Sequence, residues 1–132
     1  MNIKEISKEI HQVNVDKGFW DEGKNRNKGE MIALIHSELS EALEADRDNK
    51  RAKAGKFMID IGTYFEEKGE RFDNFFKQCF EEDVKNSLED ELADVAIRLF
   101  DFAYGFDIDL EWHIYNKLCY NKLRPHKHGK KY

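Results

Sequence analysis

The chain contains a single proline, Pro125, close to the end of its 132 residues. A proline inside a helix removes a backbone hydrogen bond and clashes with the preceding turn. No residue before position 125 therefore forbids long helices. The composition agrees, since 40% of the residues are hydrophobic and 37% are charged, as expected for helices with one buried and one solvated face.

Apolar residues recur at spacings of three and four in four segments, which predicts four amphipathic helices. The predicted helices cover about residues 3–13, 30–46, 88–104 and 110–123. Gly105 suits the C-terminal stop of the third helix, and Ser87 followed by Asp90 suits its N-terminal cap. Residues 21–28 are polar and contain a glycine, so we expect a loop there.

Residues 49–86 form a stretch that is too long for a simple turn between the second and third helices. The stretch opens with four basic residues and then holds six of the ten phenylalanines: Phe57, Phe65, Phe72, Phe75, Phe76 and Phe80. The last four have the spacing of an amphipathic helix that needs a partner surface. We therefore expect one all-α domain over residues 1–132, with a helical, Phe-rich insertion at about 49–86.

Several classes of protein are disfavoured by simple counts. No stretch approaches the roughly 18–20 apolar residues that a membrane-spanning helix requires, and residues 1–10 lack the apolar core of a secretory signal. Cys79 and Cys119 lie far apart with no CxxC, which gives no case for a disulfide framework or a thiolate zinc site. The net charge of −5 disfavours nucleic acid as a partner. We expect a cytoplasmic protein that binds neither a membrane nor nucleic acid.

Two pairs of acidic residues, each spaced three apart, lie within predicted helices: Glu38 with Glu41, and Glu91 with Asp94. Residues three apart on an α-helix differ by about 60° around the axis, so each pair projects from nearly one line. A single pair of this kind is usually a solvated helix face. Two pairs on consecutive helices predict four carboxylates around one space.

Glu38 falls inside the apolar arc of Ile35, Leu39 and Ala42, which we expect to face the core. Glu41 and Glu91 lie at the margins of their arcs, and Asp94 lies further out. A carboxylate on an apolar face is costly unless something neutralises it. A hard divalent cation would do so, and oxygen-only ligands suit Mg²⁺ or Mn²⁺ rather than zinc.

Basic residues near the end of the chain supply a candidate phosphate-binding face. Lys117, Asn121 and Arg124 follow one another at i, i+4 and i+7, so two cations and an amide share one side of the last predicted helix. The alternative is a basic helix end that complements the helix dipole. Three lysines lie further along the chain: Lys127, Lys130 and Lys131. They either steer an anionic substrate electrostatically or only form a solvated tail.

Trp20 could stack on a nucleotide base, and a buried core tryptophan is an equally good interpretation. No histidine follows a glutamate by three residues, so the Glu-x-x-His of di-iron bundles is absent. The sequence also lacks HExxH, a phosphate-binding GxxxxGK[ST] loop and GxSxG. We interpret His36 and His113 as packing residues.

With these acidic pairs and basic residues, the chain resembles the all-α nucleoside triphosphate pyrophosphohydrolases of the MazG-like family. The ExxE and ExxD pairs resemble the family signature, Lys17-Gly18-Phe19-Trp20-Asp21 resembles the entry segment of one branch, and residues 37–45 (SELSEALEA) resemble its second helix. The basic stretch 117–131 is similar to the family's basic end. The similarity spans the chain except residues 49–86. Ser37 stands where some members carry a further glutamate, and the separation between the acidic pairs is longer than expected.

This resemblance implies a helical bundle that assembles as a homodimer or homotetramer. It also implies Mg²⁺-dependent cleavage of (deoxy)nucleoside triphosphates between the α and β phosphates, which yields the monophosphate and pyrophosphate. We expect the four acids to be the metal-binding and catalytic residues, and Lys117, Asn121, Arg124 and Trp20 to bind substrate. Two alternatives remain. One is a non-catalytic module of the same fold that binds nucleotide or a protein, and the other is a structural helical oligomer with the Phe-rich insertion as its interface.

Overall fold

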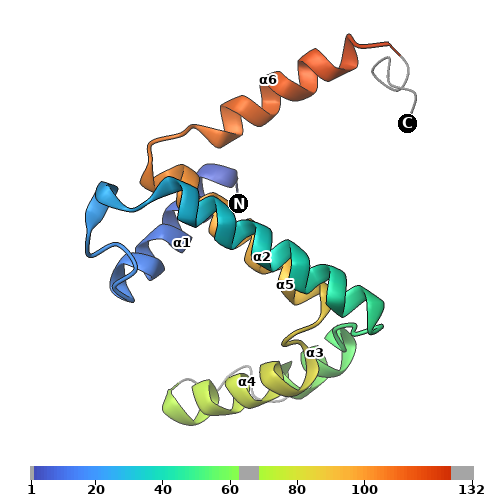
Figure 1. The fold of residues 1–132 in the computed structure, drawn as a ribbon. Helices are drawn as coiled ribbons and strands as arrows, with labels where there is room; N and C mark the ends of the chain where they lie inside the picture. Colours follow the sequence, from blue (N-terminus) through green and yellow to red (C-terminus); the bar gives the residue numbers. More distant parts are fainter. Residues whose placement is uncertain (1, 63–68, 126–132) are drawn as a thin grey trace. The chain divides into compact units, whose positions relative to one another are not determined.

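The computed structural model describes residues 2–62 and 69–125, and within them every regular element is a helix (Figure 1). These elements are α1 (Ile3–Asp16), the short 3₁₀ turn η1 (Gly23–Asn25), α2 (Lys28–Arg47), α3 (Ala54–Gly62), α4 (Glu70–Asp83), α5 (Leu88–Gly105) and α6 (Leu110–Lys122). The chain divides into two compact units. The terminal unit comprises Met1–Asn27 with Ile97–Tyr132, and the central unit comprises Lys28–Ala96.

The all-α class and the four predicted helices are confirmed, and correspond to α1, α2, α5 and α6. At the start of α5 the backbone N–H of Asp90 donates to Ser87 Oγ at 3.2 Å, which confirms the predicted cap. The described part of the insertion is helical, as expected. Helix α4 is the one that the phenylalanine spacing predicted, and α3 is a further helix that this spacing did not predict. Phe65 lies outside the described residues. The bundle arrangement of the four longer helices stays a prediction.

Helices α3 and α4 of the central unit pack side by side (Figure 1). Their contact is aromatic, since Phe57 of α3 meets Phe76 and Phe80 of α4 edge-on, with ring centroids 5.4 and 6.1 Å apart. Asp83 at the end of α4 is buried and accepts a hydrogen bond from Lys56 Nζ at 2.5 Å. The aromatic face of α4 therefore has its partner surface within the insertion itself.

Hydrogen bonds fix the two ends of the insertion to each other. The N–H of Leu88 at the start of α5 donates to the carbonyl of Lys50 at 3.1 Å. The N–H of Ala52 donates to the Glu89 carboxylate at 3.0 Å, and this bond lowers the pKa of Glu89 below its ordinary value. The C-terminal end of α2 and the N-terminal end of α5 are thereby held together.

The terminal unit is organised around a buried carboxylate, Asp101 of α5, which is 4% exposed. The indole N–H of Trp20 lies 3.0 Å from both of its oxygens, and His11 Nδ1 of α1 lies 2.8 Å from one of them. The Trp20 ring lies against the backbone of Gly105, where an added Cβ would come within 2.1 Å of it. Three distant parts of the sequence thus meet at one carboxylate that has hydrogen-bond partners within the unit.

Helix α5 ends at Gly105 as predicted, but not because glycine adopts a left-handed conformation there. The left-handed residue is Asp107, with φ 55°. The N–H of Ile108 donates to the carbonyl of Ala103 at 2.8 Å, and that of Asp107 donates to Tyr104 at 3.1 Å, the pattern of a Schellman cap. A glycine at position 105 is required instead by the close approach of the Trp20 ring.

The buried face of α2 differs from the predicted apolar arc. Its buried residues are Met31, Glu38, Ala42 and Ala45, whereas Leu39 is 45% exposed. The expectation that Leu39 faces the core is therefore wrong. Successive residues turn by about 100° around a helix axis, so Leu39 points away from the stripe that Glu38 and the two alanines form.

Large apolar side chains remain exposed elsewhere in the chain, and α6 shows this most clearly, with Trp112, Tyr115, Leu118 and Tyr120 all more than half exposed. His36 and His113 are exposed too, so neither is a core residue, although the His113 ring packs edge-on against Trp112 with centroids 4.8 Å apart. None of the described helices is both long enough and apolar enough to cross a membrane.

Candidate metal centre

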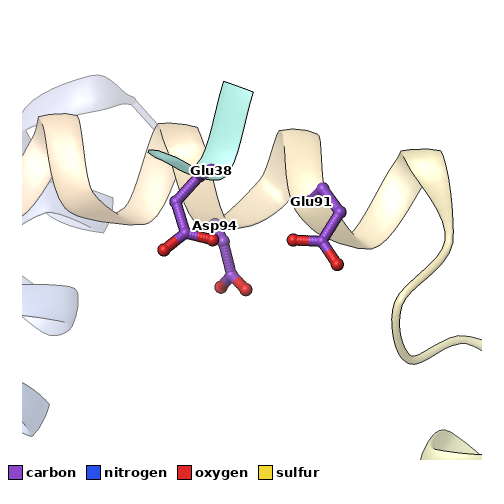
Figure 2. A group of neighbouring side chains, drawn as sticks. All are labelled: Glu38, Glu91 and Asp94. Carbon is purple, nitrogen blue, oxygen red and sulfur yellow. The ribbon is translucent and has the colours of Figure 1, made fainter. Parts of the chain in front are cut away.

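Glu38 of α2 meets Glu91 and Asp94 of α5 inside the central unit. One oxygen of each carboxylate lies within 4.8 Å of one oxygen of each of the others. The three side chains point to the same side of α5, with Asp94 beside Glu38 and Glu91 one turn away (Figure 2). Three of the four acids predicted from the two pairs thus come together from two helices.

Burial differs among the three acids. Glu38 and Glu91 are 6% and 5% exposed, and Asp94 is half-buried. The burial of Glu38 and the outer position of Asp94 agree with the helical pattern, but Glu91 lies deeper than its place at an arc margin suggested. Two carboxylates therefore lie largely out of water next to a third.

Electrostatics at Glu91 are unfavourable to its own charge. Burial raises its pKa above the ordinary 4.5, and the neighbouring charges of Glu41, Asp90, Asp94 and Glu38 raise it further. Each of these influences favours the neutral acid. A cation among the carboxylates would reverse the balance, because it stabilises the charged form.

The oxygen spacing suits a hard divalent cation. Mg²⁺ binds oxygen at about 2.0–2.1 Å, so two opposite ligands of one ion lie about 4.2 Å apart. Pairs of oxygens within 4.8 Å need only small side-chain adjustments to reach that spacing. Such an ion usually keeps several waters or phosphate oxygens as further ligands, so three carboxylates from the protein are a sufficient set.

Glu41, the fourth predicted acid, is exposed and does not belong to the group of three. It still lies close to that group, since its charge is the largest electrostatic influence on Glu91. Glu41 and Glu91 also line one open cavity together. Glu41 therefore stands beside the three clustered carboxylates and remains able to act on a molecule bound there.

The predicted substrate-binding residues Lys117, Asn121 and Arg124 belong to the terminal unit, and Arg124 lies beyond the end of α6. Lys117 Nζ lies 5.1 Å and the Arg124 guanidinium 5.8 Å from the centre of the same Tyr120 ring, so both cations lie beside one ring. Asn121 lies between them, and its side-chain Oδ1 is buried without a hydrogen-bond partner. Their role in binding phosphate stays a prediction. Lys127, Lys130 and Lys131 lie outside the described residues.

Trp20 has the surroundings of a core residue, which is the second of its two interpretations. It is 8% exposed, and its ring contacts His11 and Phe106 edge-on. The Arg26 guanidinium lies 5.0 Å from the ring centre. Stacking of this ring on a base would require Arg26 or another neighbour to move aside.

No family model, curated protein or solved structure matches the chain. The resemblance to the MazG-like family therefore depends on the motifs in the sequence alone.

The sequence patterns missed two residues beside the acids, Lys50 and Asn86, which line the cavity shared by Glu41 and Glu91. The available signal was weak. Lys50 belongs to the basic run that opens the insertion, and nothing in the sequence distinguishes it from the other three cations of that run. Asn86 has no distinguishing pattern beyond its place before a helix.

Proposed function

We propose that this protein is a hydrolase that cleaves (deoxy)nucleoside triphosphates between the α and β phosphates and depends on Mg²⁺ or Mn²⁺. The products are the nucleoside monophosphate and pyrophosphate. The observation that carries the proposal is the convergence of Glu38, Glu91 and Asp94 from two helices, with two of the three buried. The ordered acidic pairs and their resemblance to the MazG-like family support the choice of substrate.

Each acid has a role in this proposal. Glu38, Glu91 and Asp94 would hold the divalent cation, which would supply neutralisation of phosphate charge and activation of a water near neutral pH. Glu41, adjacent but outside the group of three, accepts the proton of the attacking water. The water oxygen forms a new bond to phosphorus as the P–O bond to the leaving pyrophosphate breaks.

The proposal includes assembly into a homodimer or homotetramer around a four-helix core. Exposed apolar residues on α6 support this part, together with half-exposed Leu39 and Leu92. Surfaces of this kind usually mark an interface when they are extensive. Light scattering at micromolar concentration should give a multiple of 15.7 kDa, and a particle of that mass itself would contradict the assembly.

Pyrophosphate release from a panel of ribo- and deoxynucleoside triphosphates tests the function directly. We expect release with Mg²⁺ or Mn²⁺ and none in EDTA. Glu38→Gln and Asp94→Asn should each lower turnover by more than about 100-fold, since the loss of groups that only support a metal ligand already has effects of ~10–100-fold. Helical content by circular dichroism should not change.

Glu81→Gln, an exposed acid on α4, is the matched control and should keep full activity. Full activity in chelator, or in both cluster variants, would contradict the proposed function. Binding of metal and nucleotide without release of pyrophosphate would instead support the non-catalytic alternative.

A further inference from the structure

An open cavity of about 430 Å³ adjoins the acid cluster in the central unit. Glu41, Glu44 and Ala45 of α2 form one part of its lining, and Glu91 of α5 belongs to both the cavity and the cluster. The lining contains no aromatic ring and only one apolar residue, Ala45. A polar molecule held at the cluster could therefore extend into this space, whereas a nucleotide base would find nothing to stack on.

Three side chains that can donate hydrogen bonds line the same cavity. The Ser40 hydroxyl already donates to the carbonyl of His36 at 3.1 Å, which leaves Lys50 and Asn86. Lys50 follows α2 after a left-handed turn at Asn49, with φ 53°, and its N–H donates to the carbonyl of Ala45 at 2.9 Å. Asn86 itself has φ 58° and precedes α5, and its N–H donates to the Asp90 carboxylate at 2.9 Å. The backbone around both donors is thus fixed by local turns.

Lys50 is the one member of the basic run that lines the cavity. Arg51 is bound to Asp46 at 2.7 Å, and the other two lysines of the run are drawn to the buried Asp83. Lys50 Nζ lies 3.2 Å from Asp48 in a pair whose two side chains are more than half exposed. Exposed pairs are weak, so little free energy opposes the exchange of Asp48 for an anion in the cavity.

We propose that this cavity binds the pyrophosphate portion of a metal-bound nucleoside triphosphate, with Lys50 and Asn86 donating to its oxygens. The inference rests on the proposed function, because the cluster must hold the metal that brings the anion. Glu41 and Glu44 repel a phosphate chain that arrives alone. The cavity therefore accepts the anion only with its cation, and Lys50 offsets the negative charge that remains.

Calorimetric titration with inorganic pyrophosphate in the presence of Mg²⁺ tests the inference. Lys50→Gln should weaken binding by about 10–100-fold, the effect of losing one charged hydrogen bond, and Lys50→Arg should restore most of it. Asn86→Gly, which keeps the left-handed backbone, should weaken binding less. Arg51→Gln, with the same charge change on the same segment, should bind like the wild type.

Titration with Mn²⁺ alone separates this inference from the function on which it rests. The wild type and Lys50→Gln should bind Mn²⁺ equally well. Failure of the wild type to bind Mn²⁺ would overturn both the function and the inference. Normal Mn²⁺ binding without pyrophosphate binding, or equal pyrophosphate binding by Lys50→Gln and Arg51→Gln, would overturn the inference alone.

Discussion

Buried carboxylates occur in both units of this chain, and their surroundings are opposite. In the terminal unit Asp101 accepts the indole N–H of Trp20 and pairs with His11. In the central unit Glu91 is equally buried, but every influence on its pKa raises that pKa, and four of these influences are neighbouring acids. Asp101 therefore has its partners within the protein, whereas the charged form of Glu91 would be stabilised by a bound cation.

The difference separates an acid whose partners lie within the protein from one that we propose binds a cation. A buried polar group that has its partners contributes to a specific fold, whereas one surrounded by like charges destabilises it. Such a cluster is a candidate functional site because its cost to folding is recovered only when something binds. The two carboxylates should therefore respond in opposite ways to removal of their charge.

Asp101→Ala should produce the largest change in stability. The substitution leaves the buried Trp20 N–H without an acceptor and deprives His11 of its partner, so we expect a loss of about 2–4 kcal/mol. The free energy of unfolding from urea titration measures it. Asp101→Asn, which retains one acceptor oxygen, should lose less. An Asp101→Ala variant as stable as the wild type would remove the structural half of the comparison.

Lys117→Ala should have the next largest effect, on kinetics and not on stability. If the α6 cations bind phosphate, the loss of one charge-assisted contact of about 1.5–3 kcal/mol lowers kcat/KM by roughly 10–100-fold. Lys117 is exposed, so the melting temperature should barely move.

Lys122→Ala is the control for this prediction, because Lys122 is also exposed and lies in the last turn of α6. It should leave kcat/KM unchanged. Equal kinetics for the two variants and the wild type would show that Lys117, Asn121 and Arg124 only complement the dipole at the end of the helix. The phosphate contacts beyond those proposed for Lys50 and Asn86 would then pass to Lys24 and Arg26, which precede α2, and to Lys28 at its start.

Glu91→Gln should have the smallest effect, with a sign opposite to that of Asp101→Ala. In chelator the variant should be more stable than the wild type at neutral pH, because it lacks a charge that folding disfavours. When folding raises the pKa of a carboxyl, the carboxyl does not oppose folding at pH values below its unfolded-state pKa, where it is protonated in both states. As pH rises through the folded-state pKa, the folded protein must carry the charge, and this stability is lost.

The stability difference between Glu91→Gln and the wild type should therefore grow as pH rises from the ordinary pKa of 4.5 towards neutrality. Thermal melts in EDTA over that range measure it. A Glu91→Gln variant that is less stable than the wild type at every pH would mean that the charge of Glu91 does not destabilise the fold. The comparison with Asp101 would then fail.

Local periodicity predicts the helices well, and it places three of the four predicted acids on faces that do meet. It fails where the answer depends on contacts between distant segments. Asp101 lies 90 positions after His11 and 81 positions after Trp20. The only local signal at Asp101 is that two phenylalanines flank it. Helix α3 has only nine residues, too few to show a clear period.

The position of Leu39 shows a second limit. Hydrophobicity alone centres the buried face of α2 on its large apolar residues. The actual buried stripe contains Glu38, Ala42 and Ala45, because small side chains permit close packing and the acid meets Glu91 and Asp94. An apolar pattern therefore predicts the helix more reliably than the direction of its buried face.

Binding of Mn²⁺ to the protein without substrate tests the central claim most directly, because it isolates the acid cluster from turnover. Electron paramagnetic resonance of free Mn²⁺ should reveal saturable binding by the wild type. Glu38→Gln and Asp94→Asn should each weaken it by at least about tenfold, while Asp101→Asn, a buried acid outside the cluster, should leave it unchanged. No saturable binding by the wild type, or equal binding by all four proteins, would contradict the assignment of this cluster as a metal centre.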